Sequence, residues 1–146
     1  NMAVVARLAP SSAIRLIALG GEYSRSANGF VGMETIEMLR NYKANRAFFS
    51  VTGILPAEGG ITNAPSIEAQ IKRAMLESSQ ENYLMIDSSK FGVVSLVNVV
   101  PFSHIDHVIT DRAPQKDYLD LFDRYEIDLI IAEQNITADR NAPSDQ

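Results

Sequence analysis

The stretch NYLMIDSSKFG, Asn82–Gly92, decides how the rest of the chain is interpreted. Its first part is apolar enough for a buried strand, and its second part holds an acid, two serines, a lysine and a glycine. A buried strand that ends in such residues is typical of an α/β sheet, in which ligands bind outside the carboxyl ends of parallel strands. The question is whether other apolar runs of the chain end in the same way.

Apolar runs alternate with segments of helical periodicity along the chain. Strands are predicted at Ile14–Gly21, Arg46–Gly53, Asn82–Asp87, Val93–Val100, His107–Asp111 and Ile127–Ala132. Helices are predicted at Gly32–Tyr42, after a capping Ser66, and at Pro114–Tyr125. The segment Ile54–Pro65 is rich in glycine and proline and is predicted to be a loop. This alternation predicts an α/β fold with a mostly parallel sheet flanked by helices.

Length and composition limit the possible classes of protein. The 146 residues suffice for one domain with its own core. The absence of cysteine excludes disulfide bonds, thiolate metal sites and a cysteine nucleophile. No apolar run approaches the ~18 residues of a membrane helix, so we expect a cytoplasmic protein. The net charge is −5, and Arg40, Lys43 and Arg46 form only a modest basic cluster, so this stretch itself is not expected to bind DNA.

Two groups of charged residues are candidates for ligand binding. Lys90 follows Ser88 and Ser89, and a lysine can hold a phosphate or carboxylate as a point charge. The alternative is a solvated lysine in a turn. Glu68 and Lys72 lie four residues apart on a predicted helix. They either face a ligand or form a surface ion pair worth about 0.2–0.5 kcal/mol.

Two further pairs of small residues follow apolar runs. Gly20 and Gly21 close one run, and Thr52 and Gly53 close another. Glycine allows the backbone to approach a ligand closely, but it also forms ordinary turns. The surrounding sequence GGEYSRSANGFVG fits neither the dinucleotide-binding nor the phosphate-loop fingerprint. The residues alone leave both interpretations open.

No metal site and no cofactor are predicted. His104, Asp106 and His107 are close in sequence, but their spacing matches no helical zinc motif. A serine nucleophile is not indicated either, because the chain lacks a G-x-S-x-G signature.

Four segments, in this order, resemble the effector-binding domain of DeoR-type bacterial transcriptional regulators. They are LGGEYSRSANGFVG, GITNAPSIEAQIKRAM, MIDSSKFG and IDHVITD. The resemblance extends from Asn1 to about Ala132, so residues 1–132 are interpreted as a sensor domain and residues 133–146 as a polar tail.

The resemblance implies a fold shared with ribose-5-phosphate isomerase, glucosamine-6-phosphate deaminase and coenzyme A transferases. It implies a phosphorylated sugar or related small anion as effector, a homo-oligomer, and operator DNA bound through an N-terminal winged helix-turn-helix. That DNA-binding segment is absent from this sequence. The resemblance also implies a first strand-loop-helix unit with a phosphate-binding turn, for which this sequence shows no counterpart, so the domain is interpreted as N-terminally truncated.

Carried over by position, the resemblance implies that Lys90 contacts the sugar or its acid group, with Glu68 and Lys72 in the same crevice. Thr52 stands where the family often has aspartate, and a hydroxyl is a poor general base, which favours sensing over catalysis. The alternative is a sugar-phosphate isomerase or deaminase with Glu68 as base. The predicted effector-binding residues are Lys90, Lys72, Glu68, Gly20, Gly21, Thr52 and Gly53.

Overall fold

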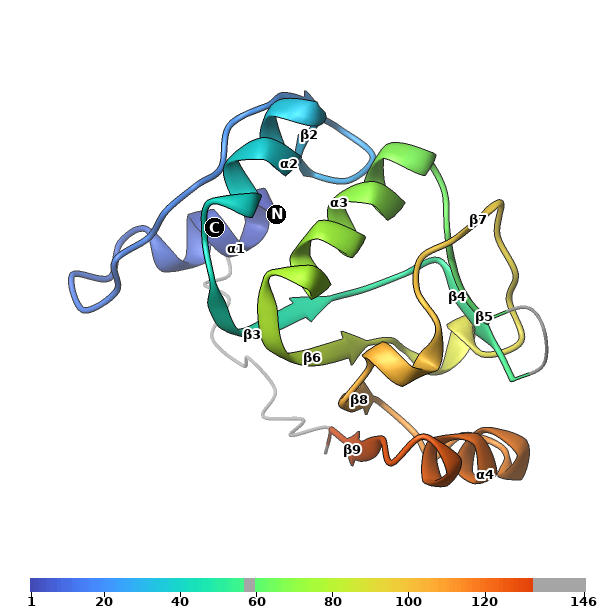
Figure 1. The fold of residues 1–146 in the computed structure, drawn as a ribbon. Helices are drawn as coiled ribbons and strands as arrows, with labels where there is room; N and C mark the ends of the chain where they lie inside the picture. The colour runs from blue at the N-terminus through green and yellow to red at the C-terminus, as the bar shows by residue number, and fades with distance from the viewer. Residues whose placement is uncertain (57–59, 133–146) are drawn as a thin grey trace, which may run out of the picture.

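The structure is a computed structural model that describes residues 1–56 and 60–132. Its helices are α1 (Met2–Leu8), α2 (Met33–Arg40), α3 (Ser66–Glu77) and α4 (Lys116–Arg124), with short 3-10 turns η1 (Ser88–Lys90) and η2 (Phe102–His104). Its strands are β1 (Glu22–Ser24), β2 (Gly29–Val31), β3 (Ala44–Phe49), β4 (Gly53–Leu55), β5 (Gly60–Asn63), β6 (Ser79–Met85), β7 (Val97–Asn98), β8 (His107–Thr110) and β9 (Asp128–Ile131). Figure 1 shows their arrangement.

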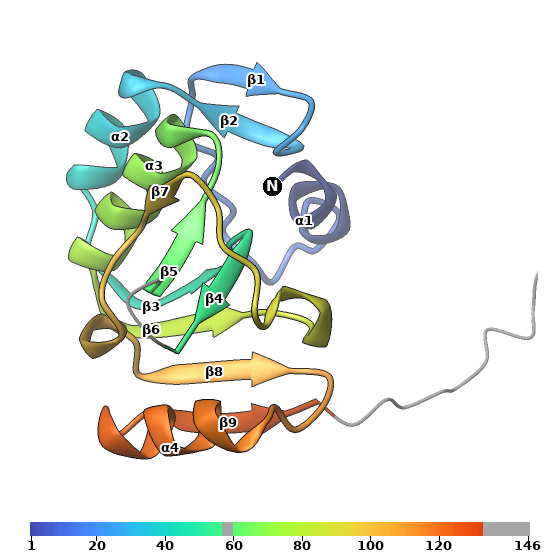
Figure 2. The same ribbon diagram turned by 90° about the vertical axis from the view of Figure 1, so that its right-hand side faces the viewer.

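A four-stranded parallel sheet, in the order β3-β6-β8-β9, forms the centre of the fold. The strands lie side by side in both Figure 1 and Figure 2. The predicted α/β class is therefore confirmed, as are the strands expected at Arg46–Gly53, Asn82–Asp87, His107–Asp111 and Ile127–Ala132. Since the strands are parallel, their carboxyl ends, and the residues that follow them, meet at one edge of the sheet.

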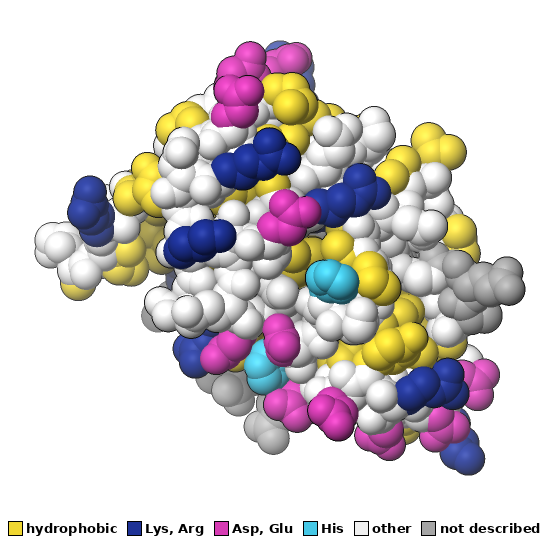
Figure 3. Space-filling model, viewed as in Figure 1, with side chains coloured by type: hydrophobic (Ala, Val, Ile, Leu, Met, Phe, Trp, Pro, Cys, Tyr) yellow, Lys and Arg dark blue, Asp and Glu magenta, His cyan; other side chains and the backbone are white. Residues whose placement is uncertain are grey.

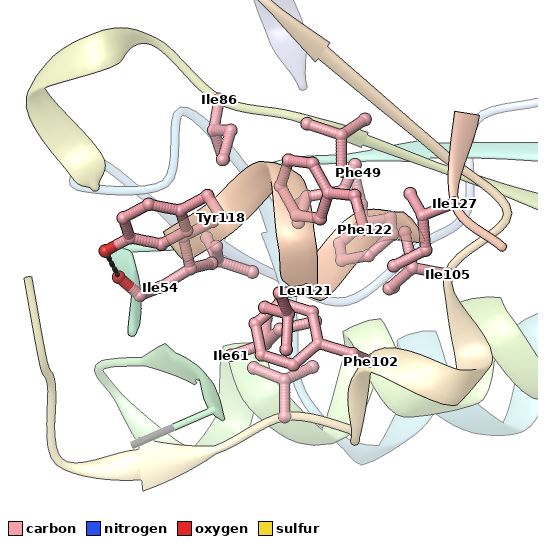
Figure 4. Close-up of a cluster of buried hydrophobic side chains, with 14 of the residues drawn as sticks. Phe49, Ile54, Ile61, Ile86, Phe102, Ile105, Tyr118, Leu121, Phe122 and Ile127 are labelled. Atoms are coloured by element: carbon pink, nitrogen blue, oxygen red, sulfur yellow. Dashed lines mark hydrogen bonds between the residues drawn. The ribbon is translucent and has the colours of Figure 1, made fainter. Parts of the chain in front are cut away.

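The hydrophobic core lies against one face of this sheet. Leu84 and Val108 of the parallel sheet, Ile54 and Ile61 of a second sheet, and Phe122 of α4 are all almost completely buried there. The second sheet is antiparallel, in the order β4-β5-β7. Figure 4 shows side chains from both sheets and α4 converging, with the Tyr118 hydroxyl donating to the Ile54 carbonyl oxygen at 3.2 Å. The same hydroxyl accepts from the Gly92 N–H at 2.6 Å.

Two predicted strands and a predicted loop were wrong in whole or in part. Ile14–Gly21 forms no strand, and Ile17 is 48% exposed. An apolar run becomes a strand only where a neighbouring strand supplies hydrogen-bond partners, and no described strand pairs with it. Within Val93–Val100 only β7 is a strand. Ile54–Pro65 is not simply a loop, because β4 and β5 form an antiparallel pair within and next to it.

The start of the chain contains two elements that were not predicted. The Asn1 side chain accepts from the Ala3 N–H at 2.9 Å and so caps α1, a helix in which no residue is buried. Strands β1 and β2 form a short hairpin. The helices predicted near α2, α3 and α4 are confirmed, but α3 begins after Pro65 and Ser66 makes no capping hydrogen bond. None of the helices in the described ranges has the length and apolar character needed to cross a membrane.

Candidate functional site

The turn that follows β6 brings Lys90 to the carboxyl end of β3. The Lys90 Nζ donates to the Oγ of Ser50, the first residue after β3, at 2.8 Å. It lies 4.0 Å from the Asp87 Oδ2, and 28% of the lysine side chain is exposed. The ammonium group is thus held against the end of a neighbouring strand rather than directed into bulk solvent, and a small anion can reach it.

A second polar group lies at the first turn of α3. The Lys72 Nζ donates to the Asn63 Oδ1 at 2.5 Å, and the Asn63 Nδ2 donates to the Glu68 Oε2 at 3.2 Å. The distance from Lys72 Nζ to Glu68 Oε2 is 3.5 Å. Each of the three side chains therefore contacts the other two, and we call this group the polar triangle. Only 2% of Asn63, the last residue of β5, is exposed, so its side chain is held in place by the surrounding protein.

A cavity of about 690 Å³ adjoins the polar triangle. Ser50, Glu68 and Lys72 supply polar groups to its wall. The remaining wall is largely apolar and comes from α1, residues 16–19, β2, β3 and the exposed side of α3. The cavity lies along the outer edge of β3, which pairs with β6 and with no other described strand. Apolar walls with a few convergent polar groups are typical of small-molecule sites.

The two lysines influence each other electrostatically. Burial lowers the pKa of Lys72, the attraction of Glu68 opposes this effect, and the positive charge of Lys90 lowers the pKa further. Each ammonium group has one carboxylate nearby, since Glu68 lies 3.5 Å from Lys72 and Asp87 lies 4.0 Å from Lys90. The two positive charges are therefore formally balanced, and the looser of the two pairs is the one at Lys90. On the face drawn in Figure 3, basic side chains lie over α2 and α3, and acidic side chains lie both at the top of the view and towards α4.

Two aspartates at strand ends hold the turn that carries Lys90. The Asp87 side chain accepts from the Ser89 N–H at 3.0 Å, and hydrogen bonds from Ser89 lower the pKa of Asp87. Asp111, just after β8, accepts from the Ser88 N–H at 2.5 Å and from the Ser88 hydroxyl at 3.0 Å. Burial by itself raises the pKa of Asp111, but the hydrogen bonds from Ser88 outweigh it and the pKa is lowered.

Acid should therefore release this turn. The Asp111 pKa is lower in the folded state than its ordinary value of 3.8, so its hydrogen bonds are complete above that value and are lost as the pH falls through the lowered folded pKa. In an NMR titration, the Ser88 amide shift should move with a midpoint below 3.8. Asp111→Asn should remove the larger part of this titration, and the remainder reports the neighbouring Asp87. Asp106→Asn, which removes the charge of a carboxylate that accepts from the Asn82 N–H in the middle of β6, should leave the titration unchanged.

The structure places the other predicted residues against protein groups. Gly21 abuts Thr35 of α2 and Val31 of β2, and Gly53 abuts the backbone of Val93. The Thr52 Oγ1 lies 3.5 Å from the Asn63 Oδ1, at the margin of the polar triangle. Lys90, Lys72, Glu68 and Thr52 are thus brought near the ends of β3 and β5, whereas the close packing around Gly21 and Gly53 is explained without a ligand. Gly20 is exposed and lies close only to the Met38 Sδ. A ligand-binding role for any of the seven stays a prediction.

Asn63 was not singled out by the sequence. It stands in the stretch that was predicted to be a loop, where an asparagine does not suggest a binding role. No apolar run marks it, since Ile61 stands alone between two glycines and the polar residues Thr62 and Asn63. As for metals, no group of three or more His, Asp or Glu side chains suited to holding an ion exists among residues 1–56 and 60–132. His107 instead stacks on Tyr83, with ring centroids 4.1 Å apart.

Fold and cavity together are typical of an α/β domain that binds a small molecule. The chain belongs to the family described as the DeoR C terminal sensor domain, which matches residues 1–112. It is 34% identical over 119 residues to the HTH-type transcriptional regulator IolR of Bacillus subtilis (strain 168), covering 82% of this chain and 47% of that protein. It is 32% identical over 128 residues to the HTH-type transcriptional repressor GlcR of the same organism, covering 88% and 49%.

A third relative is the Glycerol-3-phosphate regulon repressor of Escherichia coli (strain K12), which is 28% identical over 129 residues, covering 88% of this chain and 51% of the relative. The chain thus spans about half the length of these curated relatives. All three are transcriptional regulators by name, so the comparisons favour the sensor interpretation over the isomerase or deaminase alternative.

Proposed function

We propose that this chain is the ligand-sensing part of a DeoR-type transcriptional regulator and that its effector is a phosphorylated sugar or a related small anion. The observation that carries the proposal is a pair of lysines near this edge of the sheet. Lys90, after β6, is bonded to Ser50 at the end of β3, and Lys72 of α3 belongs to the polar triangle beside the cavity. The names of relatives agree with a role in sugar metabolism, since one regulates an L-fucose operon and another a glycerol-3-phosphate regulon.

The same proposal covers the rest of the regulator. Operator DNA would be bound through a winged helix-turn-helix elsewhere in the protein, the regulator would assemble as a homo-oligomer, and it would act in the cytoplasm. Effector binding and DNA binding would then be coupled, and the coupling must be reciprocal: a ligand that weakens operator binding is itself bound less tightly by the operator complex.

The expected additional strand-loop-helix unit stays a prediction, and one feature supports it. Parallel sheets are normally continued or covered at their edges, because an open edge exposes unpaired backbone groups. Among the described strands, β3 has one free edge, and the apolar cavity runs along it. A further parallel strand at this edge would fill the apolar part of the cavity. The part next to the polar groups at the strand ends would stay open.

A thermal-shift screen of the full-length protein with sugar phosphates tests the proposal. A ligand at one hundred times its dissociation constant should stabilise the folded state by about 2.7 kcal/mol. The corresponding non-phosphorylated sugars serve as controls and should shift the melting temperature much less. If no phosphorylated compound raises the melting temperature, the proposed class of effector is wrong.

A further inference from the structure

The polar triangle has a fixed polarity that limits what it can bind. The Asn63 amide oxygen faces the Lys72 ammonium and its amide nitrogen faces the Glu68 carboxylate. Turning the amide over would place a donor against a donor and an acceptor against an acceptor. Because Asn63 is only 2% exposed, water cannot easily compensate such a mismatch, so this single orientation is strongly favoured.

Counting donors and acceptors shows what the triangle offers to the cavity. A lysine ammonium has three N–H donors, and one points to Asn63 and one towards Glu68. Both protein contacts of the Glu68 carboxylate use Oε2, and no described residue hydrogen-bonds to Oε1. Since both side chains line the cavity, the triangle presents one donor and one acceptor side by side. A hydroxyl group, which donates and accepts, matches this pair, whereas a phosphate meets the repulsion of the carboxylate.

The other lysine offers a different environment. The Lys90 ammonium is accompanied by the hydroxyl of Ser50, which can also donate, and its nearest carboxylate is Asp87 at 4.0 Å. Asp87 is already engaged by hydrogen bonds from Ser89. An anion is therefore better accommodated at Lys90 than at Lys72, where Glu68 lies in direct contact.

We infer that Asn63 is a positioning residue that divides the site into two parts: it holds Lys72 and Glu68 as a hydroxyl-reading pair, which leaves the anionic group of the ligand to Lys90 and Ser50. This inference rests on the proposed function and narrows it to phosphate esters that carry a free hydroxyl group. According to this inference, Asn63 and Glu68 are the residues that make the site prefer a phosphate ester over free phosphate.

Binding of three probes to the full-length protein tests the inference: inorganic phosphate, glycerol 3-phosphate and glucose 6-phosphate. At least one ester should bind about tenfold or more tightly than inorganic phosphate, because a site built to hydrogen-bond a hydroxyl penalises ligands that lack one. Glu68→Gln should reduce this preference towards unity while inorganic phosphate binds as well as before or better, since a negative charge has been removed.

Asn63→Asp provides a second readout that needs no ligand. The added carboxylate next to the Lys72 ammonium should raise the pKa of Lys72, measured from the side-chain NMR shifts, and should also remove the preference for the ester. Asn82→Asp is the matched control: Asn82 is similarly buried, at 8% exposed, but its side chain bonds to Ser79 and His104 instead. This control should change neither the Lys72 pKa nor the preference.

The outcomes separate the two claims. Binding of all three probes with equal affinity, or an ester preference that survives both Glu68→Gln and Asn63→Asp, would overturn the inference and leave the proposed function standing. An unchanged Lys72 pKa in Asn63→Asp would overturn the positioning role. Failure of the wild-type protein to bind any phosphate compound would instead overturn the proposed function, and the inference with it.

Discussion

Replacing Gly21 by alanine should lower the free energy of unfolding by about 2–4 kcal/mol. Gly21 has φ = +134°, a conformation that residues with a side chain rarely adopt. A Cβ atom there would collide with the Thr35 Oγ1 and lie 2.5 Å from the Val31 carbonyl oxygen. Neither group can move freely, because Thr35 is buried in α2 and its hydroxyl donates to the Gly20 carbonyl oxygen at 2.6 Å.

The neighbouring glycine supplies a matched control. A Cβ atom on Gly20 would meet only the Met38 Sδ, at 3.6 Å, which is an ordinary contact. Gly20→Ala should therefore change the unfolding free energy by less than about 1 kcal/mol. Chemical denaturation of both variants measures the difference. Equal stability of the two would mean that the turn between residues 19 and 22 does not have the described conformation.

Replacing Lys90 by methionine should weaken binding of the phosphorylated effector by about 10- to 100-fold, because hydrogen bonds to a charged group contribute about 1.5–3 kcal/mol. Methionine keeps most of the apolar stem and removes the ammonium group that bonds to Ser50. Loss of this charge should also raise the pKa of Lys72, since Lys90 is one of the causes that lower it.

Isothermal titration of the wild-type and Lys90→Met proteins with the best ligand from the thermal-shift screen gives the ratio of affinities. Lys116→Met, which removes an exposed lysine at the start of α4, controls for the change in net charge. Unaltered affinity in Lys90→Met would show that the anion binds elsewhere, and the lysine would then be only a support for Ser50.

The parallel sheet could be predicted because its strands carry their signal locally. Leu84 and Val108 stand in short apolar runs that end in polar residues, and such runs fit central strands. The run Ile14–Gly21 gives the same local signal, yet forms no strand, because pairing depends on a neighbour that a local pattern does not reveal. The β4–β5 pair was not predicted, because the glycines and proline of this segment suggest a loop. In the structure these residues lie at or next to the ends of the two strands.

The site was partly predictable for a related reason. Residues that follow parallel strands meet at one edge, so Lys90 and the end of β3 could be placed together before any coordinates were known. The spacing of Glu68 and Lys72 indicated an ion pair, and 3.5 Å separates their charged atoms. The spacing could not reveal the third member, Asn63. It contacts Glu68 and Lys72 from the end of β5, and a contact between a strand and a helix depends on the tertiary fold.

The uneven distribution of buried residues gives the two walls of the cavity different mechanical properties. Ile36 is the one residue before position 44 in the buried apolar core of the described chain, and α1 contributes no buried residue. Lys72 and Glu68 stand on a helix anchored by that core, while the facing wall of α1 and residues 16–19 is only lightly attached. Regions with few buried contacts open at low free energy. One wall of the cavity is accordingly stiff and the other compliant. For ligands of different size, we therefore expect the N-terminal wall to move while Lys72 and Glu68 keep their places.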